Sequence, residues 1–442
     1  MTRPRATLSW IEIVRLGLVQ SALGAIVVLT TSTLNRVMIV ELALPAVLPG
    51  ALVGLHYAVQ LSRPRWGHGS DRGGARTPWI IGGMAVLAAG GVLAALATAL
   101  TAGAPVYGLI LAVIAFVLIG GGVGAAGTSL LALLATDVAP ERRAAAASIT
   151  WIMMIFGFAL TAGLAGGVLD PFSLTRLVAV SGGVCAIAFV LSIAAVWGVE
   201  RTGPRPAAAQ GEPLNFKAAL ADVWSEPRAR QFTIFVFISM LAYSTQDLIL
   251  EPFSGLVFGY TPGESTQLAG MQHGGVLIGM VAVALIAARA RGAGGFARRQ
   301  TFVIGGCIAS SLALTGLAAA SLAGPGWPLA PTVFLLGLAN GGFAVAAIGA
   351  MMGLAGADGA GREGMRIGLW GAAQAIAFGL GGFLGAAAID AARAVLGDVT
   401  SAFALVFALE ALLFLVAARL AVGVEAAGTG AEPTPKLAGA TS

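Results

Sequence analysis

Residues 34–78 read LNRVMIVELALPAVLPGALVGLHYAVQLSRPRWGHGSDRGGARTP and place ionisable side chains in and beside apolar segments. Arg36 and Glu41 lie at the edge of one apolar segment, and His56 lies inside the next. A basic, glycine-rich hairpin follows at 67–76. Because ionisable groups at membrane depth are costly, they are candidates for function by default. This stretch therefore bears on both the fold and the function.

The whole chain is apolar enough to reside in lipid. Of its 442 residues, 58% are hydrophobic and 10% are charged, whereas a soluble protein carries about 25% charged residues. Residues 77–136 and 300–357 contain no Asp, Glu, Lys or Arg, and each run has room for two spans of roughly 20 residues. We therefore expect an all-α membrane protein with twelve transmembrane helices, at approximately 14–34, 45–62, 78–101, 106–136, 147–168, 175–198, 230–250, 265–288, 300–322, 329–355, 367–389 and 400–420.

The two long uncharged runs indicate an internal repeat of six helices. Each run is followed by an acidic residue and then by an arginine, which are Asp137 and Arg142 in one case and Asp358 and Arg362 in the other. The chain is thus predicted to contain an N-terminal six-helix half, a cytoplasmic link, a C-terminal six-helix half and a disordered tail, at 1–199, 200–229, 230–421 and 422–442.

The distribution of basic residues predicts the orientation in the membrane. Of the 25 Lys and Arg residues, only Arg36, Arg176 and Arg393 fall in or beside odd-numbered loops. The others lie at the termini, in even-numbered loops or at helix ends that face them, so the positive-inside rule places both termini in the cytoplasm. The net charge of +5 suits an anionic lipid surface and gives no indication of nucleic acid as a partner.

The hairpin has the spacing Gly67-x-x-x-Asp71-Arg72-x-Gly-x-Arg76, which resembles the signature loop of the major facilitator superfamily. Such a loop would have a gating role, because a tight turn lets an Asp and an Arg pair across neighbouring helix ends and hold one conformation. The corresponding loop at 289–299 keeps glycine and arginine but lacks Asp, so any latch there is weakened. The resemblance predicts the major facilitator fold and says nothing about the substrate.

Two stretches resemble a narrower family, the PucC/LhaA family. They are 34–78, quoted above, and 243–275, which reads YSTQDLILEPFSGLVFGYTPGESTQLAGMQHGG. The family consists of facilitator-like proteins of phototrophic bacteria that are tied to assembly of light-harvesting complexes and proposed to deliver bacteriochlorophyll. The resemblance implies bacteriochlorophyll or a related tetrapyrrole as the bound group, light-harvesting antenna polypeptides and membrane lipid as partners, and a location in the bacterial inner (intracytoplasmic) membrane.

Four charged residues lie at the predicted ends of equivalent helices. Arg36 and Glu41 end the first helix, and Asp247 and Glu251 end the seventh, where their spacing of four residues places them on one face. Three interpretations stay open: anchoring at the membrane interface, a gate or pigment-contacting polar cluster, and proton coupling through Asp247 or Glu251.

Two histidines occupy matching positions in the two halves. His56 lies in the second predicted helix and His273 in the eighth, each close to glycine. A neutral imidazole is a good axial ligand for the magnesium of a chlorin, and small neighbours would let a flat macrocycle approach. The alternative is a hydrogen bond to a neighbouring helix. His56 with Gln60 has the spacing of a polar clasp, and Gln272, beside His273, is a candidate ligand contact.

The sequence contains no nucleotide-binding loop, dinucleotide fingerprint, catalytic triad order or zinc spacing, so we expect a protein that is not an enzyme. The preferred hypothesis is an antenna assembly factor that binds or delivers bacteriochlorophyll. An alternative is a proton-coupled exporter of an apolar small molecule that uses Asp247 or Glu251. A third is a scaffold for antenna helices that holds no pigment.

The orientation is testable with a single cysteine placed in the 200–229 link. A membrane-impermeant thiol reagent should label it only from the cytoplasmic side, because the link follows an even number of spans. Labelling from the periplasmic side would contradict both the twelve-span topology and the cytoplasmic termini.

Overall fold

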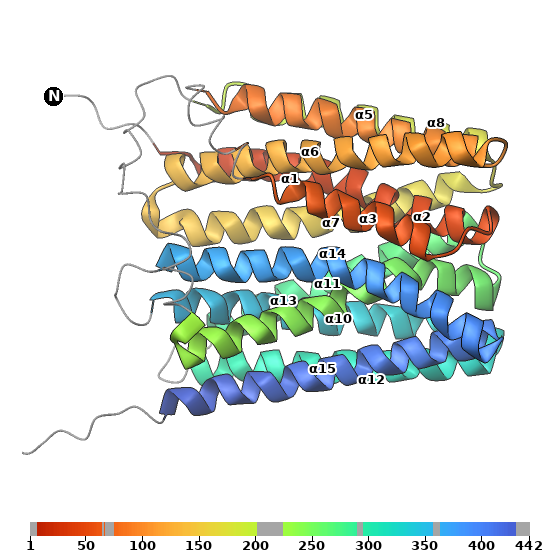
Figure 1. Cartoon of the computed structure of the whole chain (residues 1–442). Helices are drawn as coiled ribbons and strands as arrows, with labels where there is room; N and C mark the ends of the chain where they lie inside the picture. Colours follow the sequence, from red (N-terminus) through yellow and green to blue (C-terminus); the bar gives the residue numbers. More distant parts are fainter. Residues whose placement is uncertain are drawn as a thin grey trace, which may run out of the picture.

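The computed structural model describes residues 7–63, 66, 75–200, 224–289, 295–356 and 363–429, and these residues form helices and connecting turns without a β-strand. The helices run roughly along one axis (Figure 1). Within the described part of the chain, eleven helices are long and apolar enough to cross a membrane, and a shorter apolar helix occupies Val47–Gln60. The predicted all-α membrane fold is confirmed.

The N-terminal half begins with one long helical segment. It consists of α1 (Trp10–Val28), the π-helical turn η1 (Leu29–Thr33), α2 (Leu34–Arg36) and a second π-helical turn, η2 (Val37–Glu41). The remaining helices of this half are α3 (Val47–Gln60), α5 (Thr77–Thr101), α6 (Pro105–Asp137), α7 (Arg143–Leu169) and α8 (Leu174–Val196).

The C-terminal half repeats this arrangement. Its helices are α10 (Pro227–Phe258), α11 (Pro262–Arg289), α12 (Gly295–Ala323), α13 (Leu329–Gly356), α14 (Glu363–Leu396) and α15 (Val399–Thr429). The end of the bundle at which α1 begins and α15 finishes is called the terminal end here, and the other is called the opposite end (Figure 1). α15 continues past residue 421, where the sequence predicted a disordered tail to begin.

Two predicted helix ends are wrong. The first helical segment continues to Glu41, so Arg36 lies inside it, and α10 continues to Phe258, so Asp247 and Glu251 lie in its interior. The charges do not end α10, because their partners come from neighbouring helices. Gly259 ends it instead, with a left-handed φ of 71° and an N–H that bonds the carbonyl of Gly255, as is common at helix C-termini.

Each half packs around its own apolar core. The N-terminal core includes Leu16, Ile119 and Leu130, and Leu248, Ala386 and the partly buried Leu256 join it from the other half. The C-terminal core is a separate cluster rich in phenylalanine, with Phe253, Phe343, Phe403, Phe407 and Phe414 all buried. Two cores of this kind are what a six-plus-six repeat predicts.

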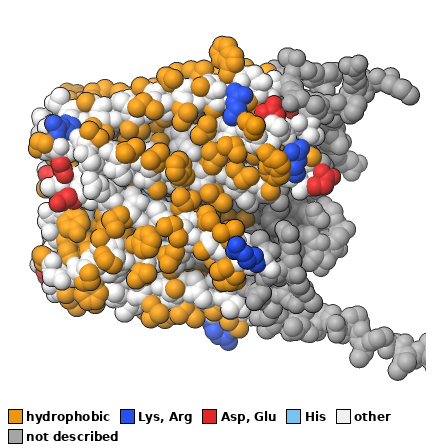
Figure 2. Space-filling view, turned by 180° about the vertical axis from the view of Figure 1, so that it is seen from behind, with side chains coloured by type: hydrophobic (Ala, Val, Ile, Leu, Met, Phe, Trp, Pro, Cys, Tyr) orange, Lys and Arg blue, Asp and Glu red, His pale blue; other side chains and the backbone are white. Residues whose placement is uncertain are grey.

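The outer surface suits a lipid environment. Figure 2 shows hydrophobic side chains spread over the middle of the visible face, with Lys and Arg mainly toward the terminal end. Many large apolar side chains are exposed on this surface, among them Leu164, Ile187, Leu312 and Leu335. The molecule is therefore a multi-span membrane protein, and its polar side chains must find partners inside the bundle.

The halves meet along two lateral seams and one central contact. α3 packs on α14, α7 packs on α11, and the segment η1–η2 lies against α10. Glycine allows the α7–α11 seam to close, since a Cβ on Gly270 would lie 2.8 Å from the backbone nitrogen of Gly163. Small residues commonly permit this approach between membrane helices.

The seam predicts different outcomes for two glycines one turn apart. Gly270→Ala should lower the free energy of unfolding by about 1–3 kcal/mol, because its methyl group meets backbone that cannot rotate away. Gly274→Ala should be neutral or slightly stabilising, since a Cβ there meets no atom within 4 Å and alanine favours the helix. Thermal unfolding in detergent compares the two variants. Equal stability would show that the seam is not tightly closed at Gly270.

Candidate functional site

A buried carboxylate lies where η1 of the N-terminal half meets α10 and α11 of the C-terminal half. Glu251 is 1% exposed. Its Oε1 accepts a hydrogen bond of 2.5 Å from Ser32 Oγ, and its Oε2 accepts one of 3.3 Å from Thr266 Oγ1. Because a buried carboxylate without partners is very costly, these donors stabilise Glu251 and join the halves through it.

Asn35 and Arg36 extend this contact toward the opposite end. Asn35 Nδ2 donates to the carbonyl of Leu248 at 2.7 Å. One nitrogen of the Arg36 guanidinium donates to the carbonyl of Tyr260 at 2.5 Å, and another donates to Glu41 Oε1 at 2.6 Å. Arg36 is 1% exposed, whereas Glu41 is 34% exposed. Arg36 therefore does not extend to the membrane surface but bonds the other half.

Two π-helical turns present these donors. Thr33 follows Ser32 in η1 and its hydroxyl lies 3.2 Å from that of Thr266, while Asn35 and Arg36 lie between η1 and η2. Single π-helical turns inside α-helices occur frequently at functional sites. Here the wider turn allows successive residues of one segment to face the same neighbouring half.

The halves are tied together at one end. Besides the contacts above, the backbone N–H of Val47 donates to Asp390 Oδ2 at 2.8 Å, and Thr261 Oγ1 donates to Asp170 Oδ2 at 2.6 Å. Among hydrogen bonds that join two residues described by the structure, all those between the halves lie toward the opposite end. The arrangement is thus closed at the opposite end.

His56 is held in the clasp with Gln60 that the sequence offered as one alternative. The two side chains meet at 2.8 Å between Gln60 Nε2 and His56 Nε2, and Gln60 Oε1 accepts from the Arg63 guanidinium. Because arginine only donates, it fixes the amide so that its NH₂ group faces the imidazole. His56 Nε2 is then the acceptor, and Nδ1 carries the proton and is buried without a partner.

His273 has a different environment. It forms no hydrogen bond with any residue that the structure describes, and its Nδ1 is buried without a partner. Its ring lies 5.0 Å from that of Phe158 on α7, which places it at the α7–α11 seam. On one side Gly275 fits tightly against α13, whereas the Cα of Gly274 faces open space. The two histidines are therefore equivalent in the repeat but not in chemistry.

Asp247 of α10 is partly buried and bonds a side chain of α11. Its Oδ1 accepts a hydrogen bond of 3.1 Å from Gln272 Nε2, so the predicted candidates Asp247 and Gln272 are brought together. The carboxylate also lies within electrostatic range of Tyr57 and Tyr243. Asp247 and Glu251 share one side of α10, but each has its own partners.

Three aromatic rings that the sequence analysis missed connect the halves near Asp247. Tyr57 of α3 and Tyr243 of α10 each lie 5.8 Å from the ring of Phe378 on α14. The chain contains only 4 tyrosines, and two of them meet here. A sequence signal existed, because Tyr57 follows His56 directly and Tyr243 opens the stretch that carries the family resemblance.

Glu410 was also missed. It lies in α15, is 1% exposed, and neither carboxyl oxygen has a hydrogen-bond partner. Gln246 on α10, the helix that contacts α15, is likewise fully buried with both amide atoms unpartnered. The signal in the sequence is a lone acid within the otherwise uncharged run 399–418.

Of the predicted gating residues, Gly67, Asp71 and Arg72 lie outside the described residues. Arg76 is described and is 5% exposed. Its backbone N–H donates to Glu200 Oε1 at 2.7 Å, and its guanidinium donates to Thr136 Oγ1 at 2.7 Å. Arg76 therefore links the start of α5 to α6 and to Glu200, which follows α8, all within the N-terminal half.

The chain is similar in sequence to known proteins. A family model described as "PUCC protein" matches residues 33–429. The chain is 55% identical over 433 residues to the "Bacteriochlorophyll synthase 44.5 kDa chain" of Rhodobacter capsulatus, which covers 98% of this chain and 100% of that protein. It is 31% identical over 432 residues to "Protein PucC" of Rhodobacter capsulatus, covering 93% and 91% of the two chains.

Solved transporter structures show a similar fold. A bacterial homologue of the human lysosomal transporter Spinster, in an inward-facing and occupied conformation, superposes with a TM-score of 0.68 at 14% identity. The superposition covers 96% of this chain and 98% of the other. The likeness shows the architecture and carries no information about the substrate.

The Arg36 bridge predicts a stability effect that depends on charge. Glu41→Gln should lower the free energy of unfolding by about 1–3 kcal/mol, because the buried guanidinium loses its ion-pair partner while part of Glu41 is screened by solvent. The double variant Arg36→Met with Glu41→Gln should be no less stable than Glu41→Gln alone, since it also removes the uncompensated charge.

Thermal unfolding in detergent at neutral pH measures these differences. Glu264→Gln is the matched control, because Glu264 is an exposed carboxylate at the same end of the bundle. Its Oε2 accepts a hydrogen bond of 2.9 Å from the N–H of Thr261. If Glu41→Gln unfolds at the same temperature as the wild type, the bridge does not stabilise the closed end.

Proposed function

The chain belongs to the PucC family and has the major facilitator fold, and on that premise we propose that it binds bacteriochlorophyll or a related tetrapyrrole and delivers it to light-harvesting antenna polypeptides during their assembly. Relatives that match almost the whole chain carry the names "Protein PucC" and "Bacteriochlorophyll synthase 44.5 kDa chain". The proposed location is the bacterial inner (intracytoplasmic) membrane, with both termini in the cytoplasm.

The observation that carries the proposal is the environment of His273. A chlorin magnesium needs an axial ligand with a free lone pair. His273 fits this need, because its imidazole makes no hydrogen bond with any described residue. His56 does not fit in this arrangement, since Gln60 donates to its Nε2. When bound, the pigment would supply the light-absorbing macrocycle, and the protein would supply a ligand and an apolar enclosure.

The α7–α11 seam gives a route from the lipid phase. His273 faces this seam, where Phe158 and close-packed glycines make contact beside an apolar cluster that includes Ile155, Val276 and Met280. Few hydrogen bonds would therefore have to break for the helices to separate sideways and admit an apolar pigment. The hydrogen bonds at the opposite end would keep the halves joined while this happens.

We propose that the chain handles the pigment without transforming it, although one relative is named as a chain of a synthase. Two of its buried acids already serve structural contacts, since Glu251 bonds two hydroxyls and Asp247 bonds Gln272. These contacts occupy the carboxylates in holding helices together.

A second candidate function is proton-coupled export of an apolar compound. It is favoured by Glu410, a membrane-embedded carboxyl without a hydrogen-bond partner, which lies within electrostatic range of Asp247. Such residues often mark proton relays. A proton gradient that drives flux into or out of vesicles, abolished by Glu410→Gln, would support this function in place of pigment delivery.

Pigment binding is predicted to depend on one histidine. His273→Leu should lose most of the bound pigment, because leucine keeps the apolar volume but cannot ligate magnesium. His56→Leu is the matched control: it should retain pigment but lower stability by about 1–3 kcal/mol, because the buried Gln60 amide loses its hydrogen-bond acceptor. The measurement is the near-infrared absorbance per protein after gentle purification from a phototrophic membrane.

Other outcomes separate the rival roles. Full pigment in His273→Leu would show that this imidazole is not the ligand. Antenna polypeptides that co-purify with the wild type while no pigment is bound would replace delivery with the scaffold role.

A further inference from the structure

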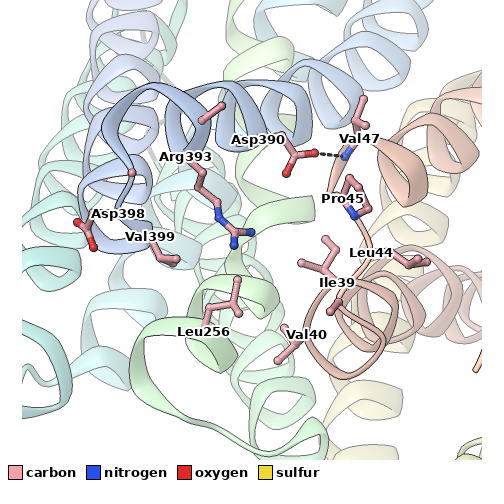
Figure 3. A pocket seen from close by; sticks show the side chains of 13 residues that line it. Ile39, Val40, Leu44, Pro45, Val47, Leu256, Asp390, Arg393, Asp398 and Val399 are labelled. Atoms are coloured by element: carbon pink, nitrogen blue, oxygen red, sulfur yellow. Dashed lines mark hydrogen bonds between the residues drawn. The ribbon is translucent and has the colours of Figure 1, made fainter.

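A pocket opens at the opposite end of the molecule, away from the histidines. Its volume is about 720 Å³, within the range of small-molecule sites. Figure 3 shows that it lies between the segment following η2 in one half and the turn from α14 to α15 in the other. Its walls are mainly apolar and come from both halves, with Ile39, Val40, Leu44, Pro45, Leu256 and Val399 among the lining residues.

One cation projects into this pocket. Arg393 lies in the last turn of α14 and is partly buried. Its guanidinium points toward the pocket centre, between Leu256 and Val399 (Figure 3). It forms neither an ion pair nor a side-chain hydrogen bond with any residue in the described ranges. A guanidinium beside apolar walls is a strong site for an anion, because little water competes for its donors.

The two nearby carboxylates are already engaged. Asp390 Oδ2 accepts from the backbone N–H of Val47 at the start of α3, at 2.8 Å. Asp398 Oδ2 accepts from Thr400 Oγ1 and from the N–H of Ser401, both at 2.7 Å. Both carboxylates therefore serve the N-terminal turns of helices, which favour negative charge.

The geometry around Arg393 leaves its charge available. Figure 3 shows the Asp390 carboxylate directed to Val47 and the Asp398 carboxylate turned away from the guanidinium. The hydrogen bonds from Thr400 and Ser401 hold the pKa of Asp398 well below its usual value, so this aspartate stays in its capping role at neutral pH. Arg393 is then the uncommitted charge of the pocket.

The end of α14 adjoins lipid. Val395 and Leu396, two and three residues after Arg393, are 84% and 46% exposed. In a membrane protein such side chains lie at the lipid boundary, so a lipid molecule can reach the pocket from the side. Phosphate suits the planar fork of arginine, and acyl chains suit the apolar walls.

We propose that this pocket binds a membrane phospholipid, with the headgroup phosphate on Arg393 and the upper part of an acyl chain against Ile39, Leu44 and Leu256. Since the walls come from both halves, the bound phospholipid contacts both of them beside the Val47–Asp390 hydrogen bond. It thereby adds to the contacts that keep the opposite end closed.

The test uses the full chain reconstituted in vesicles of phosphatidylglycerol and phosphatidylcholine, followed by native mass spectrometry of the protein with its retained phospholipid. Arg393→Gln should weaken retention of one phospholipid about tenfold, because a charge-assisted hydrogen bond is lost. Arg393→Lys should retain it in part, since the charge stays while the planar fork is lost.

Arg176→Gln is the matched control, because Arg176 is an arginine at the same end whose guanidinium donates to the carbonyl of Pro171 at 3.0 Å. It should retain phospholipid like the wild type. Equal retention by Arg393→Gln and the wild type would overturn the proposal. So would displacement of the phospholipid by an equal concentration of oleate, which would show that the site takes a carboxylate amphiphile instead.

Discussion

The hydrogen bonds around Glu251 set the constraint on which the rest of the arrangement depends. A carboxylate inside an apolar bundle must have donors, and those of Glu251 come from Ser32 in one half and Thr266 in the other. The nearby buried guanidinium of Arg36 likewise needs acceptors, which are the carbonyl of Tyr260 and the carboxylate of Glu41. These polar side chains thus lie between the halves and hydrogen-bond one half to the other.

This placement determines which contacts would have to change for the halves to separate. Each inter-half hydrogen bond is individually modest, since water or another donor can replace it when the halves separate. The apolar cores, in contrast, belong almost entirely to one half each. Opening at the opposite end therefore requires exchange of a few polar partners. Opening along the middle of the α7–α11 seam requires loss of van der Waals contact at glycines, Phe158 and the apolar cluster of Ile155, Val276 and Met280.

The sequence alone predicted the number of membrane helices and the six-helix repeat, because uncharged runs mark the spans and charged loops and the hairpin mark the connections between them. It was insufficient for helix ends at Glu41 and Phe258, because charged residues were interpreted as marking the interface. Their partners come from the other half, and no local pattern reveals a partner more than 200 residues away. The signal for the end of α10 was Gly259, and the signal for a further buried acid was Glu410 in an uncharged run.

The candidate site was predicted only in part, because the repeat suggested that the two histidines would be equivalent. Matching positions in a repeat predict matching surroundings, but His56 and His273 differ because of what lies one and two turns further along. Gln60 follows His56 by four residues and donates to its Nε2, and Arg63 in turn holds Gln60, whereas the residues at the same spacings after His273, Leu277 and Met280, are apolar. A symmetric scaffold therefore offers one clasped and one available imidazole. Under the proposed function, that asymmetry leaves a single histidine of the pair free to ligate a pigment.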